Sequence, residues 1–322
     1  MKKSSKIWLI TAAVLILAGL AVFAGTMATQ NWDLNKLSNI KYETNSFEIS
    51  DEFDNLIIEA ETDDIIFKLS NDDKCKVVCY EQEKVKHSAG VNSKTLEIKV
   101  TDKREWYDYI GMFSFDCPKT TVYLPRNHYS SLSISTDTGN IDIPKDFTFN
   151  SIEITGSTGD VNCYASSKET TKIKLSTGDI TLSDVLSGEI NLAVSTGKIS
   201  IKSATCEGNI SVGVSTGKLL ISDTKCKDLN SKGSTGNIVL NNVIASQSVS
   251  LQRSTGDVTL NECDSKELFI KTSTGDVRGT LLSEKVFITD TSTGEISVPK
   301  TLNGGKCEIT TSTGDIKINI IA

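Results

Sequence analysis

Histidine, proline and aromatic residues are scarce in this chain of 322 residues. It contains two histidines, four prolines and only 6% Phe, Trp and Tyr. A metal or acid–base site built on histidine has only His87 and His128 to draw on. No Cys-x-x-Cys spacing occurs, so the usual redox and zinc motifs are missing. We therefore predict no metal site, no cofactor and no catalytic residues.

Positive charge is also in deficit. All the residues after position 30 together carry 31 basic and 41 acidic side chains, a net charge of −10. Nucleic-acid-binding surfaces are basic, so this balance argues against a nucleic-acid partner.

The start of the chain has three lysines followed by an uncharged, mostly apolar run at residues 7–30. About 20 apolar residues can cross a bilayer as a helix. We predict that residues 1–30 are a membrane anchor, with a polar linker at 31–44. A cleaved signal peptide is the alternative, with Thr26-Met27-Ala28 as the cleavage site, and a buried soluble helix is a third interpretation. In the first two cases the lysines stay cytoplasmic and the bulk is extracytoplasmic.

The second half of the chain repeats one turn sequence, Ser-Thr-Gly-Asp, with small variations. The dipeptide Thr-Gly recurs ten times at intervals of 19 or 20 residues. Spacing this regular indicates a structural repeat. The turn glycines are Gly139, Gly159, Gly178, Gly197, Gly217, Gly236, Gly256, Gly275, Gly294 and Gly314.

Apolar side chains alternate on both sides of each turn. Positions two and four after the glycine are apolar, as in Ile180 and Leu182, with Gly279 the exception. A period of two indicates strands with one buried face, which a unit of this size cannot bury alone. We predict an all-β fold: a parallel β-solenoid of about ten rungs at 131–322, preceded by one transmembrane helix.

The turn itself has an architectural explanation, because glycine supplies the positive φ of a tight bend. The residue after glycine varies among Asp, Asn, Glu and Lys, which indicates a solvated edge. Calcium binding by Asp257, Asp276 and Glu295 is an alternative, although one carboxylate per rung is sparse for that ion.

Residues 45–130 lack the turn sequence but contain strand-like segments, which we predict at 46–50, 55–60, 64–70, 75–81, 95–100 and 120–125. We interpret 45–130 as a β-rich cap or start of the solenoid, since an open solenoid end is an adhesive sheet edge.

Residues 104–115 concentrate aromatic side chains in a chain that has few. Trp106, Tyr107, Tyr109 and Phe113 are therefore candidate partner-binding residues. A hydrophobic plug beneath the cap is the alternative interpretation.

Eight cysteines in an exported chain raise the question of disulfides. Several occupy core positions of the repeat, where a free cysteine acts as a small apolar residue, so we expect mostly core thiols. Whether Cys206 and Cys226, on successive rungs, are bonded stays open.

The S-T-G-D-[IV]-x-[LI] units, together with segments 53–65 and 122–125, resemble the putative-adhesin family of bacterial envelope proteins, of the DUF4097 kind. The resemblance implies an envelope-anchored solenoid of Gram-positive bacteria and no catalytic residues.

These observations predict a non-enzymatic, membrane-anchored extracytoplasmic protein with an adhesin-like binding or scaffold role. Its partners would be the membrane, through the N-terminal helix, and an unknown envelope component or membrane protein. An envelope-stress sensor working through a membrane partner is the alternative. A carbohydrate-active enzyme is less favoured, because no acidic triplet stands out.

Overall fold

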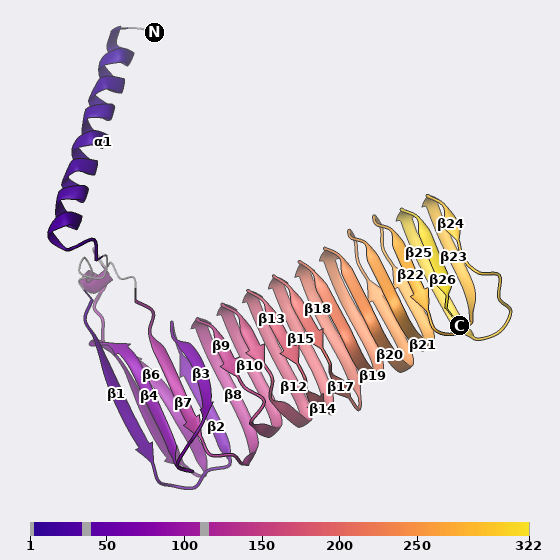
Figure 1. Ribbon diagram of the computed structural model, residues 1–322, viewed down its shortest axis with the longest axis horizontal. Helices are drawn as coiled ribbons and strands as arrows, with labels where there is room; N and C mark the ends of the chain where they lie inside the picture. The colour runs from indigo at the N-terminus through magenta and orange to yellow at the C-terminus, as the bar shows by residue number, and fades with distance from the viewer. Residues whose placement is uncertain (1–2, 34–39, 110–115, 322) are drawn as a thin grey trace.

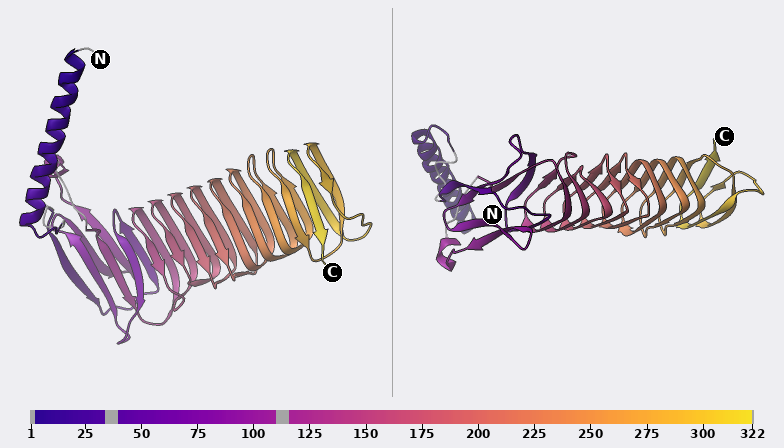
Figure 2. Two further views of the ribbon diagram at one scale, coloured as in Figure 1. Left: turned by 45° about the horizontal axis from the view of Figure 1, so that its top comes forward. Right: turned by 90° about the horizontal axis from the view of Figure 1, so that it is seen from below.

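The computed structural model describes residues 3–33, 40–109 and 116–321. One helix, α1 (Lys3–Thr29), stands apart from a long stack of β-strands (Figure 1). The chain advances along the stack from the N-terminal to the C-terminal end, and two further views show the same progression (Figure 2). The predicted fold class, a β-solenoid preceded by one apolar helix, is confirmed.

Helix α1 is long and apolar enough to cross a membrane. An 18-residue window within Ser5–Thr29 has a mean hydropathy of 2.6, and none of this window is buried by the rest of the molecule. Soluble core helices bury one face, whereas Met27 is the one buried side chain among the described side chains of this helix. The helix is therefore a membrane anchor or a signal sequence.

Each rung of the solenoid contributes one strand before the turn glycine and one after it, so the stack has two long faces. The strands of the repeat region are β8 (His128–Thr138), β9 (Ile141–Ile143), β10 (Thr148–Thr158), β11 (Val161–Cys163), β12 (Ser166–Thr177), β13 (Ile180–Ser183), β14 (Leu186–Ser187), β15 (Glu189–Thr196), β16 (Ile199–Lys202), β17 (Thr205–Cys206), β18 (Asn209–Thr216), β19 (Leu219–Thr235), β20 (Ile238–Gln252), β21 (Val258–Lys271), β22 (Val277–Leu281), β23 (Lys285–Thr293), β24 (Ile296–Ser297), β25 (Gly305–Thr313) and β26 (Ile316–Ile320).

Neighbouring rungs pair in parallel and in register, which stacks like side chains into columns. Ile154 on β10 pairs with Ile134 on β8 and with Ile173 on β12. These three side chains are at most 1% exposed, as are most apolar residues of the columns. Burying one such side chain contributes roughly 1.5–3 kcal/mol, so the columns supply the main stabilisation.

The expectation that each rung follows its predecessor is wrong at the C-terminal end. β25 lies between β21 and β23, and β26 lies between β22 and β24. The last rung in the sequence is therefore the second to last in space, and the rung of β23 and β24 closes the stack. Ile309 of β25 is buried, whereas its partner Thr289 on the closing strand β23 is only partly buried.

The N-terminal region combines parallel and antiparallel strands. Its strands are β1 (Tyr42–Ile49), β2 (Asn55–Ala60), β3 (Asp64–Leu69), β4 (Cys75–Gln82), β5 (Val85–Asn92), β6 (Thr95–Asp102) and β7 (Lys119–Leu124). β2 and β3 stack in parallel on β8 and β9, while β1, β4 and β5 pair antiparallel with their neighbours. The sequence analysis missed β5, because VKHSAGVN shows no sustained apolar alternation.

All eight cysteines are free thiols, and seven of them are buried. Cys117 alone is exposed. The buried thiols include Cys206 and Cys226, whose strands β17 and β19 pair with each other. This agrees with the expected role of cysteine as a core residue.

Candidate functional site

The repeated turn builds the solenoid corner. All ten turn glycines have positive φ. At Gly178, with φ of +132°, an added Cβ would lie 2.0 Å from the carbonyl oxygen of Gly159 on the preceding rung. Glycine is thus required both by the backbone conformation and by the close stacking of corners.

The residue after the glycine links one rung to the next. The carboxylate oxygen Oδ1 of Asp179 accepts a hydrogen bond of 2.7 Å from the backbone N–H of Lys198, one rung along. Asp160 does the same for Asp179 at 2.8 Å. From the sequence, this column was interpreted as a solvated edge, and the ladder of backbone-to-carboxylate hydrogen bonds between rungs was not predicted. Periodicity shows which residues stack, but not which groups they hydrogen-bond.

The ladder also bears on the calcium alternative. Asp315 lies between Asp276 and Glu295 in the column, since its backbone N–H donates to Asp276 and its side chain accepts from Glu295. Arg278 pairs with Asp276 at 2.5 Å, and Lys317 pairs with Asp315 and Glu295, each at 3.1 Å. Side-chain cations therefore neutralise this part of the column, which favours the architectural interpretation.

A groove of about 1030 Å³ opens in the N-terminal region. It lies between the end of β1, the β3–β4 turn and the β7–β8 connection. Glu48, Asp51, Glu52, Asp54, Asp72 and Asp73 line it, with Lys74 and Lys76 as the lining cations. Six carboxylates against two lysines give the groove a formal charge of −4.

Aromatic side chains form part of the groove wall. Phe53 stacks on Tyr129 with ring centroids 5.8 Å apart, and Tyr123 lines the groove beside them. The Tyr129 hydroxyl donates to the carbonyl oxygen of Pro125 at 2.9 Å, which fixes that ring.

Hydrogen bonds from the Ser70 hydroxyl and the Lys74 backbone N–H lower the pKa of Asp72. An acidic groove with aromatic walls suits a cationic ligand.

The aromatic candidates from the sequence lie on the 3-10 helix η2 (Trp106–Tyr109), away from this groove. Trp106 is 74% exposed and Tyr107 is 55% exposed, so the plug interpretation is wrong for these two side chains. Tyr109 is the last residue of η2, and Phe113 lies outside the described residues.

Contacts place η2 at the edge where β1 begins. Lys84 pairs with Asp108 of η2, and the Tyr42 hydroxyl donates to the carbonyl oxygen of Asp116 at 3.0 Å. Tyr42 is the first residue of β1, so the exposed aromatics lie near the point where the chain arrives from α1.

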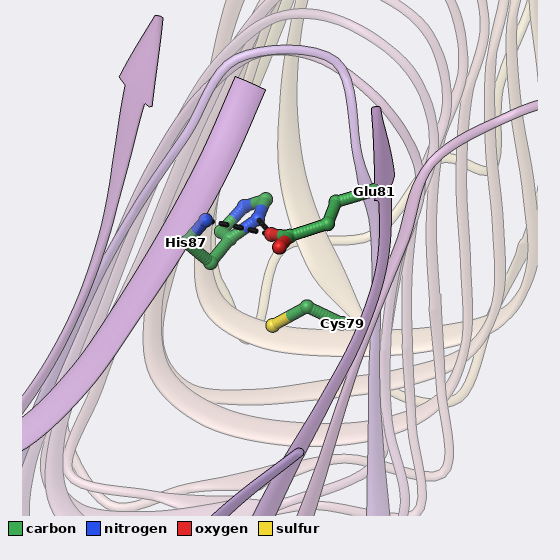
Figure 3. Close-up of side chains that lie close together, drawn as sticks. All are labelled: Cys79, Glu81 and His87. Carbon is green, nitrogen blue, oxygen red and sulfur yellow. Dashed lines mark hydrogen bonds and ion pairs between the residues drawn. The ribbon is translucent and has the colours of Figure 1, made fainter. Parts of the chain in front are cut away.

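A buried polar cluster lies in the same region. The imidazole of His87 on β5 contacts Glu81 of β4 through Nδ1 at 2.7 Å and Asp63 through Nε2 at 2.8 Å. The Cys79 thiol points toward the same centre (Figure 3). Burial opposes protonation of His87, but the hydrogen bonds to the two carboxylates outweigh it and raise the pKa of the imidazole. Sequence reasoning set this histidine aside as one of only two.

Three comparisons bear on the family. The Toastrack DUF4097 family model matches residues 53–225 and 207–321. No curated protein matches the chain. Among solved structures, one similar chain is a putative lipid binding protein from Parabacteroides distasonis, with 16% identity and a TM-score of 0.51, covering 88% of this chain and 98% of that one.

A putative adhesin from Parabacteroides merdae is also similar, with 11% identity and a TM-score of 0.50, covering 75% of this chain and 97% of that one. At such identities the likeness concerns the fold alone. The family model, however, covers nearly all of the β-stack and thereby confirms the resemblance drawn from the turn repeat. The chain belongs to the Toastrack DUF4097 family.

Proposed function

We propose that this protein is a non-enzymatic binding or scaffold protein of the cell envelope, anchored in the membrane by α1 with its solenoid outside the cytoplasm. The observation that carries the proposal is the acidic, aromatic-walled groove on a rigid β-stack. Solenoids present long regular surfaces, which suit binding.

The ligand chemistry follows from the groove's charge. Six exposed carboxylates around Phe53 and Tyr123 favour an amine-bearing ligand, such as an envelope polymer or peptide with free amino groups. An anionic lipid surface would be repelled by the same carboxylates. The groove lies at the end of β1 opposite to the point where the chain arrives from α1, so a ligand held there would be separated from α1 by the length of that strand.

Co-sedimentation of residues 31–322 tests this proposal. This part contains the complete β-stack, and none of the membrane-span window is buried against it. Isolated peptidoglycan, anionic-lipid vesicles and whole membranes would be assayed separately. We expect retention on peptidoglycan that weakens as salt is added, because exposed charge interactions are screened.

A matched pair of variants locates the contact. D51N/E52Q removes two groove carboxylates, and D184N/E207Q removes two exposed carboxylates of the repeat region. We expect the first pair to reduce retention and the second to leave it unchanged. Equal retention of both variants, or retention on vesicles alone, contradicts a cation-binding groove.

A second candidate role is a regulator that works through a membrane partner. The exposed side chains of Trp106 and Tyr107, near the start of β1, favour it. Trp and Tyr are enriched at membrane interfaces and in protein–protein contacts. The variant W106S/Y107S should then lose association with membranes while keeping its melting temperature and its retention on peptidoglycan.

A further inference from the structure

We propose that Cys79, Glu81 and His87 form a binding site for one zinc ion, which fastens the consecutive strands β4 and β5 to the first rung of the solenoid. The ligand atoms of these residues, a thiol sulfur, a carboxylate oxygen and an imidazole nitrogen, all lie within 4.8 Å of one another. Sulfur, nitrogen and oxygen donors together are the set that zinc accepts.

The geometry needs only small adjustments. Zinc bonds of about 2.0–2.3 Å in a tetrahedron separate neighbouring ligand atoms by roughly 3.3–3.7 Å. Nδ1 of His87 and Oε2 of Glu81 already lie 2.7 Å apart. Moving each ligand atom by about 1 Å or less would therefore supply three positions of the tetrahedron, with a water molecule as the fourth ligand.

Each ligand is also oriented by a second partner. Asp63 accepts from Nε2 of His87 at 2.8 Å, which leaves Nδ1 as the nitrogen that faces the centre. The Thr120 hydroxyl donates to Sγ of Cys79 at 3.8 Å, and the Asn45 amide donates to the other oxygen of Glu81 at 2.5 Å. Such outer partners orient and tune ligands at metal sites.

Burial separates this cluster from chance surface groups. Cys79 is fully buried, Glu81 is 1% exposed and His87 is 6% exposed. Binding would release the proton of the Cys79 thiol, because zinc binds the thiolate. The positive charge of Zn²⁺ would then face the carboxylates of Glu81 and Asp63.

The position explains what the ion would do. Cys79 and Glu81 lie on β4, His87 lies on β5, and Asp63 immediately precedes β3. Asp63 also occupies the corner of its rung, because its carbonyl oxygen would be 2.1 Å from a Cβ on Gly139. An ion here would therefore link β4 and β5 to the solenoid corner and stabilise the end of the stack.

Metal analysis of the full-length protein in detergent tests the site. The C117S background removes the exposed thiol, which could bind metal on its own. After chelation, Zn²⁺ should rebind at one ion per chain, release the Cys79 thiol proton and raise the melting temperature. Co²⁺ should give the near-ultraviolet absorption of a thiolate–cobalt bond.

Variants assign the ligands. C79S should lose the cobalt–thiolate absorption, and H87Q should shift the cobalt spectrum. D63N should weaken zinc affinity by about 10–100-fold. C75S, another buried thiol on the same strand, and H128Q, the exposed histidine, are the matched controls and should bind as the background does.

The proposal is overturned if the chelated background protein gives no thiolate–cobalt absorption. It is also overturned if zinc leaves the melting temperature unchanged, or if C79S binds as C75S does. Should C79S fail to fold, the proton release and the cobalt spectrum of the background protein decide the matter by themselves.

Discussion

The turn glycine meets two requirements at once, a positive φ and an approach to the preceding corner that leaves no room for a Cβ. Both apply at Gly178, whereas Gly213 lies within β18, where the nearest atom to an added Cβ is 3.8 Å away. The period of the sequence located every turn glycine. It could not show the contact with the neighbouring corner, which exists only once the rungs are stacked.

Gly178→Ala should therefore destabilise the protein by about 1–3 kcal/mol or more, the range expected for one strained residue. Gly213→Ala should change stability by no more than about 0.5 kcal/mol. Urea unfolding followed by circular dichroism measures both variants. Equal midpoints for the two would show that the corner relaxes and that glycine is not required there.

Arg253 is a residue at which the structure departs from the repeat. It is 4% exposed, and its side chain lies over Gly233, in a core column that holds Leu175 and Val214 on other rungs. Nη1 donates to the carbonyl oxygen of Gln252, but Nε and Nη2 have no hydrogen-bond partner among the described residues. Burial also lowers the pKa of this guanidinium. A buried charge with unsatisfied donors costs stability.

Arg253→Met should raise the free energy of unfolding by about 1–4 kcal/mol, because a flexible apolar side chain fills the same space without the desolvation cost. Arg253→Lys keeps the charge and is the control, which should give no gain. The denaturation midpoints of the two variants decide the question, and a loss of stability in the Met variant would mean that the guanidinium has partners in solution.

At the scale of strands, the most informative element is the closing pair of rungs. The alternation of apolar residues predicted a strand on each side of every turn glycine, whereas β19, β20 and β21 each continue through the segment between two turns. The stacking order at the C-terminal end could not follow from it, because β23 and β25 carry the same pattern. At one pair of core-facing positions β23 has Thr289 where β25 has Ile309, but Phe287 of β23 is more apolar than its partner Cys307, so side-chain polarity alone does not give the order.

Removing residues 305–322 should therefore disturb two rungs rather than one. β23 pairs with β25, so we expect residues 285–297 to lose protection in hydrogen exchange together with the deleted rung's neighbours. A chain lacking only residues 321–322 keeps β25 and β26 and is the control. Protection of residues 285–297 in the chain without residues 305–322 would show that β23 pairs with β21 instead. The rung of β25 and β26 would then be dispensable.

An ion pair between β23 and β21 gives a pH dependence. Nζ of Lys285 is buried and lies 2.8 Å from Oδ1 of Asp264. Burial opposes ionisation of Asp264, but the hydrogen bonds from Lys285 and Ser283 outweigh it, so the pKa of this carboxyl lies below its usual value. The pair therefore contributes stability above the unfolded pKa of about 3.9 and loses it as the pH falls through the lower folded pKa.

Melting temperatures of the wild type and Lys285→Met should thus converge on acidification below about pH 4, with the wild type losing more. The difference between the two proteins isolates this pair from the other carboxylates, whose titration is common to both. Parallel curves from pH 7 to pH 2 would mean that Asp264 has the same pKa in the folded and the unfolded chain.

At the scale of the whole molecule, the sequence predicted the class of fold, the apolar helix and the family. It did not predict the groove, because its carboxylates come from two separate segments, at 48–54 and 70–76, and a third segment, at 123–129, supplies tyrosines to its wall. The buried cluster was missed for a similar reason. His87 lies on the one N-terminal strand without clear alternation, and Asp63 is distant from it in the chain.

Labelling of the cysteines can show on which side of the membrane the solenoid lies. Burial raises the pKa of Cys163, Cys226 and Cys307 to about 12, so these thiols are both shielded and protonated at neutral pH. Cys117 is the one exposed thiol, and all eight cysteines lie in the described part of the chain. Because reaction with maleimide requires an accessible thiolate, the native protein should take up one label.

A membrane-impermeant maleimide applied to intact cells should therefore label the protein once if the solenoid is extracytoplasmic, and Cys117→Ser should abolish the label. Intact mass after denaturation and alkylation, with and without reductant, counts the remaining thiols and shows whether Cys206 and Cys226 are bonded. Labelling that appears only after lysis would place the solenoid in the cytoplasm. In that case the groove could not meet an envelope polymer, and α1 would hold the protein at the inner face of the membrane.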